Sequence, residues 1–425
     1  MMNEMLCQFI VKNFKSYRDE TVFDLQAANI DEHIESLLHH GDDSKFFLPV
    51  SAIYGPNGGG KSGILEAFNC LVQRITWPIS LMKMDNVQQK ALMEHLDFAK
   101  CTPFMFNETS PTEPTEFTIF FRTSGLEFRY VLSLNIDNIA FESLHMKKIG
   151  GTRSAMLFER NQNGVTLGAS MRKENVNTEV NANMPYLSFL AINYKIKNIE
   201  LVSTWFMMCS LYHIFQSVPF IQLELVGMPN NDIAFDKKLF LQMVNEIDIT
   251  IDDYCIAHGE HKEKSNEIYT IRKKGNQAYN LNLREESQGT RKLFQLLPVA
   301  LLALKSGGVL VIDEMDASLH PKLLRYIIKL FKNKKFNNNN AQLIFTSHDV
   351  TTMKGDLFRR DEIWFAAKND EGVSEIYSLY EIRDTDGARI RANAPFDKQY
   401  LQGKYGADPY LSNILSEEWG KNHES

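Results

Sequence analysis

The spacing of hydrophobic residues predicts strands and helices along most of the chain. Residues 5–25 alternate apolar and polar side chains, which predicts two short strands joined by a polar turn. Residues 115–149 alternate in the same way, with Ser124 and Gly125 as a hairpin signal, and predict an antiparallel meander that continues to Phe158. A buried strand predicted at 47–54 is followed at once by glycines and a helix that begins at Gly63.

The second half of the chain begins with a helical pattern and continues with alternating helices and strands. Residues 185–252 are rich in Leu, Phe and Met and predict mainly helices, without the heptad repeat of a coiled coil. The elements predicted after them are a β-like stretch at 254–283, helices at 289–305 and 321–332, and buried strands at 309–312 and 342–346. Because a buried strand recurs after each helix, the predicted fold class is α/β with a mostly parallel core sheet.

Composition and charge exclude several classes of protein. The 425 residues are 44% hydrophobic, so the chain can bury a large core and is not predicted to be disordered. No window reaches the roughly 18 apolar residues of a membrane-spanning helix, and Met1 to Glu4 lack the features of a signal peptide. We therefore expect a cytoplasmic protein with no membrane contact. The 46 Lys and Arg against 53 Asp and Glu give a net charge of −7, so any nucleic-acid contact must be local.

Cysteines and asparagines add two local expectations. Five cysteines are scattered without CxxC spacing, which favours buried free thiols over a disulfide framework or a zinc site; they are Cys7, Cys70, Cys101, Cys209 and Cys255. The run Asn337–Asn340 predicts a surface turn before the last buried strand.

The first candidate site is a glycine-rich loop between a buried strand and a helix. It matches GxxxxGK[ST] and consists of Gly55, Pro56, Asn57, Gly58, Gly59, Gly60, Lys61 and Ser62. Glycines let consecutive backbone N–H groups face one anion, and the helix start adds its positive end. The pattern predicts that these residues bind the phosphates of ATP, that Lys61 reaches the β- and γ-phosphates, and that the Ser62 hydroxyl ligates Mg²⁺.

The second candidate site is a pair of carboxylates after the strand at 309–312. Four consecutive apolar residues predict a strand buried on both faces, and ligands bind at the carboxyl ends of such strands. We expect Asp313 to hold Mg²⁺ and Glu314 to take a proton from the attacking water.

Three further segments, together with these two, resemble the ABC-type ATPase family. Ser287 and Gly289 stand at a helix start 26 residues before Asp313, where Ser287 alone would be interpreted as a helix cap. The resemblance implies that Ser287 and Gly289 bind the γ-phosphate of a nucleotide held by the partner subunit. It also implies that Ser318 lies in a D-loop that touches the nucleotide site of the partner subunit, and that His348 is a switch histidine. The protein is therefore expected to form a homodimer, or a higher even assembly, around ATP and Mg²⁺. His320 is also interpreted as a cap of the next helix.

The first residues of the chain and the interval between two of its motifs indicate which ABC-type ATPases it resembles. The run from Phe9 to Tyr17 is similar to the "I-x-N-F-x-S" opening of RecF, Rad50 and SMC head domains. Ser287 follows Lys61 by 226 positions, a wider interval than in transporter ATPases, so we expect a compact helical lid inserted between them. No glutamine-loop residue is assigned; the glutamines considered for it are Gln73, Gln88 and Gln89.

Three other segments resemble the stand-alone ATPases of bacterial abortive-infection and anti-phage systems of the RloA and AbiLii type, with relatives in Septu and PARIS systems. They are Asp316–Pro321, Leu157–Arg160 and Tyr400–Ala407. The resemblance implies a sensor or scaffold that controls a separately encoded effector, such as a nuclease or toxin. Two alternatives stay open: a RecF- or Rad50-like DNA-repair clamp, and a slow ATP-gated platform that stores a toxin.

The expected architecture is an ABC-type P-loop NTPase with a mostly parallel core sheet, an antiparallel β subdomain and a helical lid insertion. Its predicted parts are 1–160 with the phosphate loop and meander, 161–280 as the lid, 281–380 with the signature, carboxylates and histidine, and 381–425 as a C-terminal extension. Mixed cations and aromatics at 389–410 are interpreted as packed structure, with nucleic acid or a protein partner as the alternative. A basic stripe, formed by Lys322, Arg325, Lys329 and Lys332, is interpreted as a solvated helix face.

Overall fold

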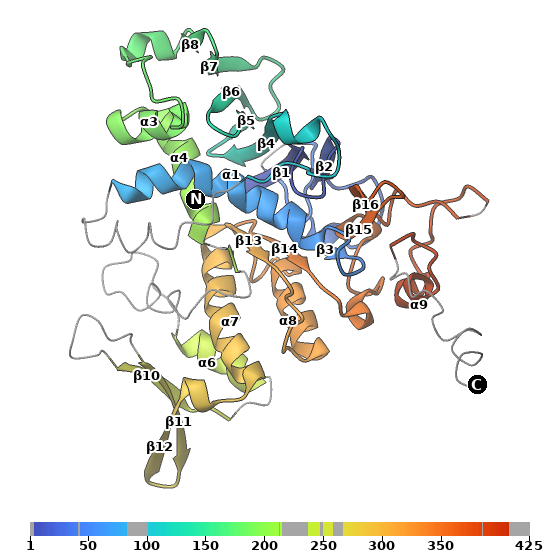
Figure 1. Ribbon diagram of the computed structural model, residues 1–425. Coiled ribbons are helices and arrows are strands. Elements are labelled where there is room, and N and C mark those ends of the chain that lie inside the picture. Colours follow the sequence, from blue (N-terminus) through green and yellow to red (C-terminus); the bar gives the residue numbers. More distant parts are fainter. Residues whose placement is uncertain are drawn as a thin grey trace, which may run out of the picture.

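Two sheets and the helices packed against them form the layers of the protein. The computed structural model describes residues 4–40, 43–82, 101–211, 213–214, 237–246, 250–257, 267–384 and 386–407. Figure 1 shows the helix α1 (Lys61–Leu81) crossing between an antiparallel sheet on one side and a mostly parallel sheet on the other. On the far face of the parallel sheet lie α7 (Gln288–Ser306) and α8 (Pro321–Lys332).

The mostly parallel sheet has the strand order β16-β15-β3-β14-β13-β9. Its strands are β3 (Val50–Tyr54), β9 (His213–Ile214), β13 (Val309–Ile312), β14 (Gln342–Thr346), β15 (Ile363–Lys368) and β16 (Ser374–Ser378). Only the β15–β16 pair is antiparallel among the described pairings of this sheet. Strands β3, β13 and β14 are buried along their whole length, and β13 is apolar at every position.

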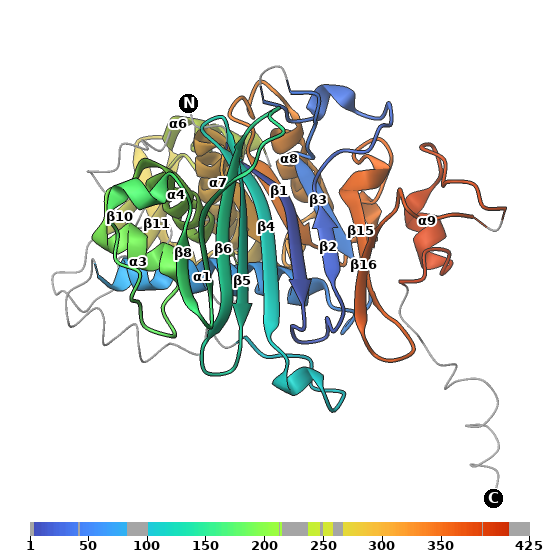
Figure 2. The same cartoon turned by 90° about the horizontal axis from the view of Figure 1, so that it is seen from above.

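The antiparallel sheet has seven strands in the order β2-β1-β4-β5-β6-β7-β8, seen together in Figure 2. They are β1 (Met5–Lys12), β2 (Thr21–Asp24), β4 (Thr115–Thr123), β5 (Leu126–Leu134), β6 (Ile139–Lys148), β7 (Ala155–Asn161) and β8 (Gly164–Leu167). Ser124 and Gly125 both have positive φ, 51° and 78°, in the two-residue turn between β4 and β5. This is the hairpin turn that the sequence predicts.

Helix α1 has hydrophobic contacts with both sheets. Twelve of its 21 residues are buried. The apolar ones among them share one cluster with residues of the antiparallel sheet and with Val309, Val311 and Ile344 of the parallel sheet. Two further helices join this cluster: α3 (Tyr186–Asn193) and α4 (Lys197–Leu211). A second cluster packs α7 and α8 on the other face of the parallel sheet.

The segment between α4 and α7 contains a helix and a small sheet. The helix is α6 (Lys237–Glu246), and the three-stranded antiparallel sheet consists of β10 (Asp253–Ala257), β11 (Glu267–Lys274) and β12 (Gln277–Asn282). The predicted β-like stretch at 254–283 corresponds to this sheet. Phe294 of α7 packs edge-on against Phe240 of α6 and Tyr254 of β10.

The C-terminal segment is packed against the end of the parallel sheet. Its helix α9 (Phe396–Leu401) places Tyr400 parallel to Phe365 of β15, with ring centroids 5.6 Å apart. Tyr405 packs on the same ring at 5.2 Å. The interpretation of these aromatics as packed structure is therefore correct for the described part, and Tyr410 lies outside the described residues.

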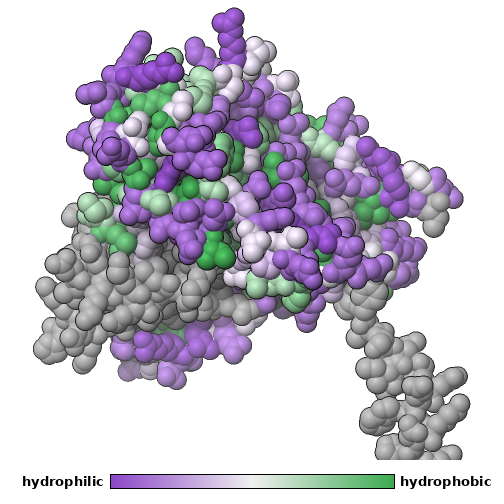
Figure 3. Space-filling view, turned by 45° about the horizontal axis from the view of Figure 1, so that its top comes forward, coloured by the Kyte–Doolittle hydropathy of each residue, from purple (hydrophilic) through white to green (hydrophobic). Residues whose placement is uncertain are grey.

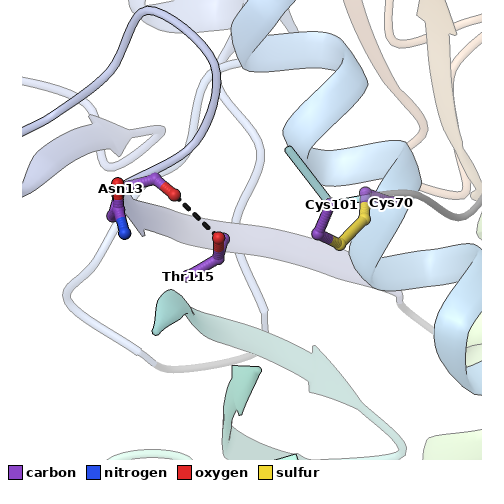
Figure 4. The surroundings of a disulfide bond; sticks show 4 residues. All are labelled: Asn13, Cys70, Cys101 and Thr115. Carbon is purple, nitrogen blue, oxygen red and sulfur yellow. Dashed lines mark hydrogen bonds between the residues drawn. A yellow bond between two sulfur atoms is a disulfide. The ribbon is translucent and has the colours of Figure 1, made fainter. Parts of the chain in front are cut away.

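A disulfide corrects the prediction that all five cysteines are free. Cys70 of α1 is bonded to Cys101, with 6.6 Å between their Cα atoms, as Figure 4 shows. The next residue, Thr102, accepts a hydrogen bond from the backbone N–H of Lys15 through its carbonyl oxygen, at 2.8 Å. The spacing of 31 residues carried no signal because the pairing depends on the fold bringing distant segments together. Cys7 and Cys209 are buried free thiols as predicted, whereas Cys255 is exposed.

Two surface predictions also differ from the structure. Asn337 is fully buried, and its side chain donates to the carbonyls of Phe331 and Ala341. Its side-chain amide therefore forms hydrogen bonds with backbone groups within the turn. A run of polar residues in the sequence does not show that one of them is buried in this way. In the basic stripe, Lys332 is bonded to the buried Glu362, so the stripe is only partly a solvated face.

We predict that Cys101→Ser destabilises the protein by about 3–4 kcal/mol, because the disulfide closes a loop of 31 residues. The free energy of unfolding from urea titrations, without reductant, measures the effect. The matched control is Cys255→Ser, which removes an exposed free thiol and should leave the value unchanged. Adding dithiothreitol should bring the wild type to the value of Cys101→Ser, and equal stability of variant and wild type without reductant would contradict the prediction.

Candidate functional site

The glycine-rich loop follows β3 and ends at α1, as predicted. Gly55 has a φ of 147°, and a Cβ atom there would lie 2.1 Å from the carbonyl oxygen of Ala366 in β15. Gly60 has a φ of 112°, and its Cβ would lie 2.6 Å from the Ser374 hydroxyl of β16. At both positions a side chain would strain the backbone and collide with the neighbouring strand. The β15–β16 pair therefore holds the loop from both ends.

Lys61 and Ser62 begin α1 and face different partners. The Lys61 ammonium is buried and donates to the carbonyls of Gly55 at 2.8 Å and Pro56 at 3.0 Å, so it lies within the curl of the loop. Burial lowers the pKa of Lys61, and the nearby carboxylates of Asp313, Glu314 and Asp316 oppose that shift. The Ser62 hydroxyl donates to Asp313 at 3.0 Å.

Asp313 and Glu314 follow β13, and both are tied to β14 by Thr346. The Thr346 hydroxyl donates to Asp313 Oδ1 at 2.6 Å and accepts the backbone N–H of Glu314 at 2.7 Å. Thr346 is fully buried, and the sequence reasoning gave it no role although it stands two residues before His348. Glu314 has a φ of 49°, a left-handed backbone that non-glycine residues rarely adopt. Such strain clusters at functional sites because the surroundings must hold it in place.

The segment that contains His348 is tied to the turn after β13 through Asp316. Both carboxylate oxygens of Asp316 accept the backbone N–H of His348, each at 3.2 Å, while the His348 side chain is exposed. Asp316 is a second residue that the sequence reasoning did not single out. The ends of β3, β13 and β14 thus bring Ser62, Asp313 and His348 to one edge of the sheet.

The helix start at Ser287 lies against the D-loop segment of the same chain. Ser287 is the N-cap of α7, and its hydroxyl accepts the backbone N–H of Thr290 at 3.2 Å. The next residue, Gln288, is 3.5 Å from the Ser318 hydroxyl, and a Cβ on Gly289 would lie 3.4 Å from the Ser318 carbonyl. Ser318 has a φ of 64°. Ser287 is thus a helix cap, as one interpretation of the sequence expects. Its hydroxyl occupies one N–H group of the first turn and leaves the others free for an anion.

His320 caps α8, the alternative left open for it. Its Nδ1 atom accepts the backbone N–H of Lys322 at 3.2 Å, and Pro321 occupies the first helical position. Among the glutamines considered for a glutamine loop, Gln73 lies on α1, whereas Gln88 and Gln89 fall outside the described residues.

The loop between β1 and β2 touches the start of α1. The Tyr17 hydroxyl donates to the Gly60 carbonyl at 3.0 Å, and the Ser16 and Ser374 hydroxyls are 2.8 Å apart. Asn13 has a φ of 56° and anchors the other side of this loop, because its amide donates to the carbonyls of Ser110 and Glu113. The N-terminal motif therefore supports the phosphate loop directly, and Tyr17 is a further contact that was not predicted individually.

Ser62 and Asp313 suit a magnesium ion. Their oxygens are 3.0 Å apart at the mouth of the glycine loop, and Mg²⁺ prefers one or two such oxygen ligands together with substrate phosphates. The donor set therefore fits the predicted ion.

A family model matches part of the chain. Residues 218–354 match a family described as "AAA domain, putative AbiEii toxin, Type IV TA system". The match spans the signature, carboxylate and histidine segments but not the glycine loop. No curated protein matches the sequence.

Solved structures of SMC heads are also similar to this chain. The SMC head domain from Thermotoga maritima is 16% identical over 88% of this chain and 98% of that chain, with a TM-score of 0.41. An SMC head bound to the C-winged helix domain of ScpA is 14% identical over 88% of this chain and 97% of that one, with a TM-score of 0.38.

The glycine loop after β3 and the carboxylates after β13 form a P-loop type of site in a mixed α/β fold, and the part of the chain that carries the carboxylates matches an AAA domain. The serine-capped helix, the contact between Gln288 and Ser318, and the N-terminal motif on the loop are the features that resemble an ABC-type ATPase head of the RecF, Rad50 and SMC kind. The predicted α/β fold class, with its mostly parallel core sheet and its antiparallel β subdomain, is confirmed.

The described part of the chain contains no helix long and apolar enough to cross a membrane.

We predict that Thr346→Val lowers the rate of ATP hydrolysis at least about tenfold, because Asp313 and the backbone of Glu314 lose their common partner. A tenfold loss corresponds to about 1.4 kcal/mol of transition-state stabilisation. Phosphate release measures it. The control is Thr76→Val on α1, a buried threonine whose hydroxyl donates only to the Val72 carbonyl in the structure. If both variants hydrolyse ATP equally fast, Thr346 has no part in positioning the carboxylates.

Proposed function

We propose that the protein binds and hydrolyses ATP and dimerises around two Mg-ATP. The observation that carries this proposal is the convergence of the glycine loop, Ser62, Asp313 and Thr346 at one edge of the parallel sheet. The backbone N–H groups of Gly55–Gly60 and the Lys61 ammonium bind the phosphates. Ser62 and Asp313 hold Mg²⁺, which when bound neutralises phosphate charge during transfer.

In this proposal Glu314 supplies the chemical step and its neighbours position the γ-phosphate. Glu314 orients the attacking water and accepts its proton, while His348 contacts the γ-phosphate. Ser287 and Gly289 of the partner subunit complete the site from the other side, and Ser318 contacts the opposite nucleotide. The helix start at Ser287 supports this role because free N–H groups and the positive end of the helix favour an anion.

We also propose that the chain is divided as its sequence suggests. In this division 1–160 and 281–380 form one split ATPase unit, 161–280 is the inserted lid, and 381–425 is an extension. The apolar cluster shared by the first unit and by β13 and β14 supports the split arrangement.

As a biological role, we propose the control of a separately encoded effector in anti-phage defence. The family description of residues 218–354, which names an AbiEii toxin and a toxin–antitoxin system, supports this direction. ATP hydrolysis stimulated by an effector encoded beside this chain supports the role. Stimulation by duplex DNA, with a steep dependence on salt, would instead favour a DNA-repair clamp. Single-turnover hydrolysis that stays slow with and without the effector would favour a platform that stores a toxin.

We predict that Glu314→Gln binds ATP within about twofold of the wild type but hydrolyses it at least about a hundredfold more slowly, because general-base catalysis contributes 10²–10⁴-fold. ATP should then increase the dimer fraction measured by light scattering. Glu200→Gln, an exposed position on α4, is the matched control and should hydrolyse ATP normally. An unchanged rate in Glu314→Gln would remove Glu314 from the mechanism, and a monomer at saturating ATP would contradict the dimer.

A further inference from the structure

A cavity of about 590 Å³ lies beside the glycine loop. One wall consists of Gly55–Gly59 and His348, and the other of Lys368 and the α9 residues Tyr400 and Leu401. The cavity therefore joins the phosphate loop to the end of β15 and the C-terminal segment. Its size is that of a small-ligand site.

The end of β15 is held at the loop by close backbone contact. The Ala366 carbonyl occupies the space that a side chain would take at Gly55 and also at Gly59, where a Cβ would lie 2.6 Å away. Lys368 follows two residues later, and in the β15–β16 register it pairs with Ser374. Because Ser374 abuts Gly60, the Lys368–Ser374 pair lies beside the loop at a fixed position.

The opposite wall is equally well supported. The Tyr400 hydroxyl donates to the Ala407 carbonyl at 2.9 Å, and its ring is stacked on Phe365. Tyr405, whose hydroxyl donates to Gln399 at 2.8 Å, packs on the same ring. In Figures 1 and 2, α9 lies beside the β15–β16 pair. Tyr400, on the wall that faces the loop, is therefore fixed by packing and by a hydrogen bond, whereas Leu401 is exposed.

Lys368 is an available cation at this cavity. It is exposed, and within the described ranges its ammonium has neither an ion pair nor a hydrogen bond. Lys61, in contrast, is buried inside the loop and bonded to two carbonyls. The face seen in Figure 3 is mostly hydrophilic where it is coloured, with hydrophobic residues in scattered groups. An unpaired ammonium next to backbone N–H groups and a histidine favours an anion at the cavity.

We propose that Lys368 is a second phosphate-binding residue, which contacts the terminal phosphate of a nucleoside triphosphate. This inference rests on the proposed ATP site, because that site places the phosphates in the loop that borders the cavity. Lysine acts on phosphate as a compact point charge on a flexible stem, so it reaches the third phosphate without a preformed hydrogen-bond geometry. In this proposal a diphosphate lacks the phosphate group that Lys368 contacts. Lys368 thereby favours triphosphate over diphosphate.

Calorimetric titration of the full-length protein with Mg²⁺ and either AMP-PNP or ADP tests the proposal. Lys368→Ala should weaken AMP-PNP binding about tenfold, as expected for loss of one charge-assisted contact, and change ADP binding less than twofold. Lys368→Arg should restore most of the affinity for AMP-PNP. The matched control is Lys398→Ala, an exposed lysine on α9 that does not line the cavity.

Two results would overturn the role of Lys368. One is equal loss of AMP-PNP and ADP affinity, and the other is no change with either nucleotide. Light scattering on the same samples should show the same dimer fraction for Lys368→Ala and the wild type at saturating AMP-PNP, because a lower fraction would assign Lys368 to the subunit interface and would also overturn the role. Lys61→Ala separates this inference from the proposed function: if it abolishes binding of both nucleotides while Lys368→Ala has no effect, only the inference fails.

Discussion

The burial of α1 between two sheets is the constraint on which the rest of the structure depends. The helix contributes to one apolar cluster with both sheets, so neither its axis nor its first turn can move without opening the core. The glycine loop is held at one end by β3, at the other by α1, and along its side by Ala366 and Ser374. A backbone fixed in this way presents its N–H groups without reorganisation, which is the condition for strong anion binding.

The same constraint explains why the polar residues of the site meet. Strands β3, β14 and β13 are adjacent and parallel, so their carboxyl ends lie at one edge, and Thr346 in the middle connects the two outer strands through Asp313, Ser62 and Glu314. A parallel sheet buried on both faces leaves its polar chemistry only at the strand ends. The left-handed backbone of Glu314 is held there by the N–H contact to Thr346.

Local patterns predicted most of the elements, and distant pairings account for what they did not predict. The glycine loop, β13, α8 and β14 are each predicted by a short local sequence pattern, without reference to the rest of the chain. Their residues therefore lie where they were expected. The Cys70–Cys101 bond, the buried Asn337 and the partners of Thr346 and Asp316 depend on segments far apart in sequence. Lys368 belongs to the same group, because only the fold brings the end of β15 to the loop.

The carboxylates beside the glycine loop oppose the binding of a polyanion, so positive groups must compensate for them. Asp313, Glu314 and Asp316 lie close enough to Lys61 to oppose the effect of burial on its pKa, and they act in the same way on Lys292 of α7. These three carboxylates also repel a triphosphate, in a chain whose net charge is already −7. Binding of a polyanion here therefore depends on positive groups at the loop itself: oriented N–H groups, Lys61, a metal ion, and further cations at its border. Lys368 supplies such a cation from the end of β15, in the cavity that it lines together with His348.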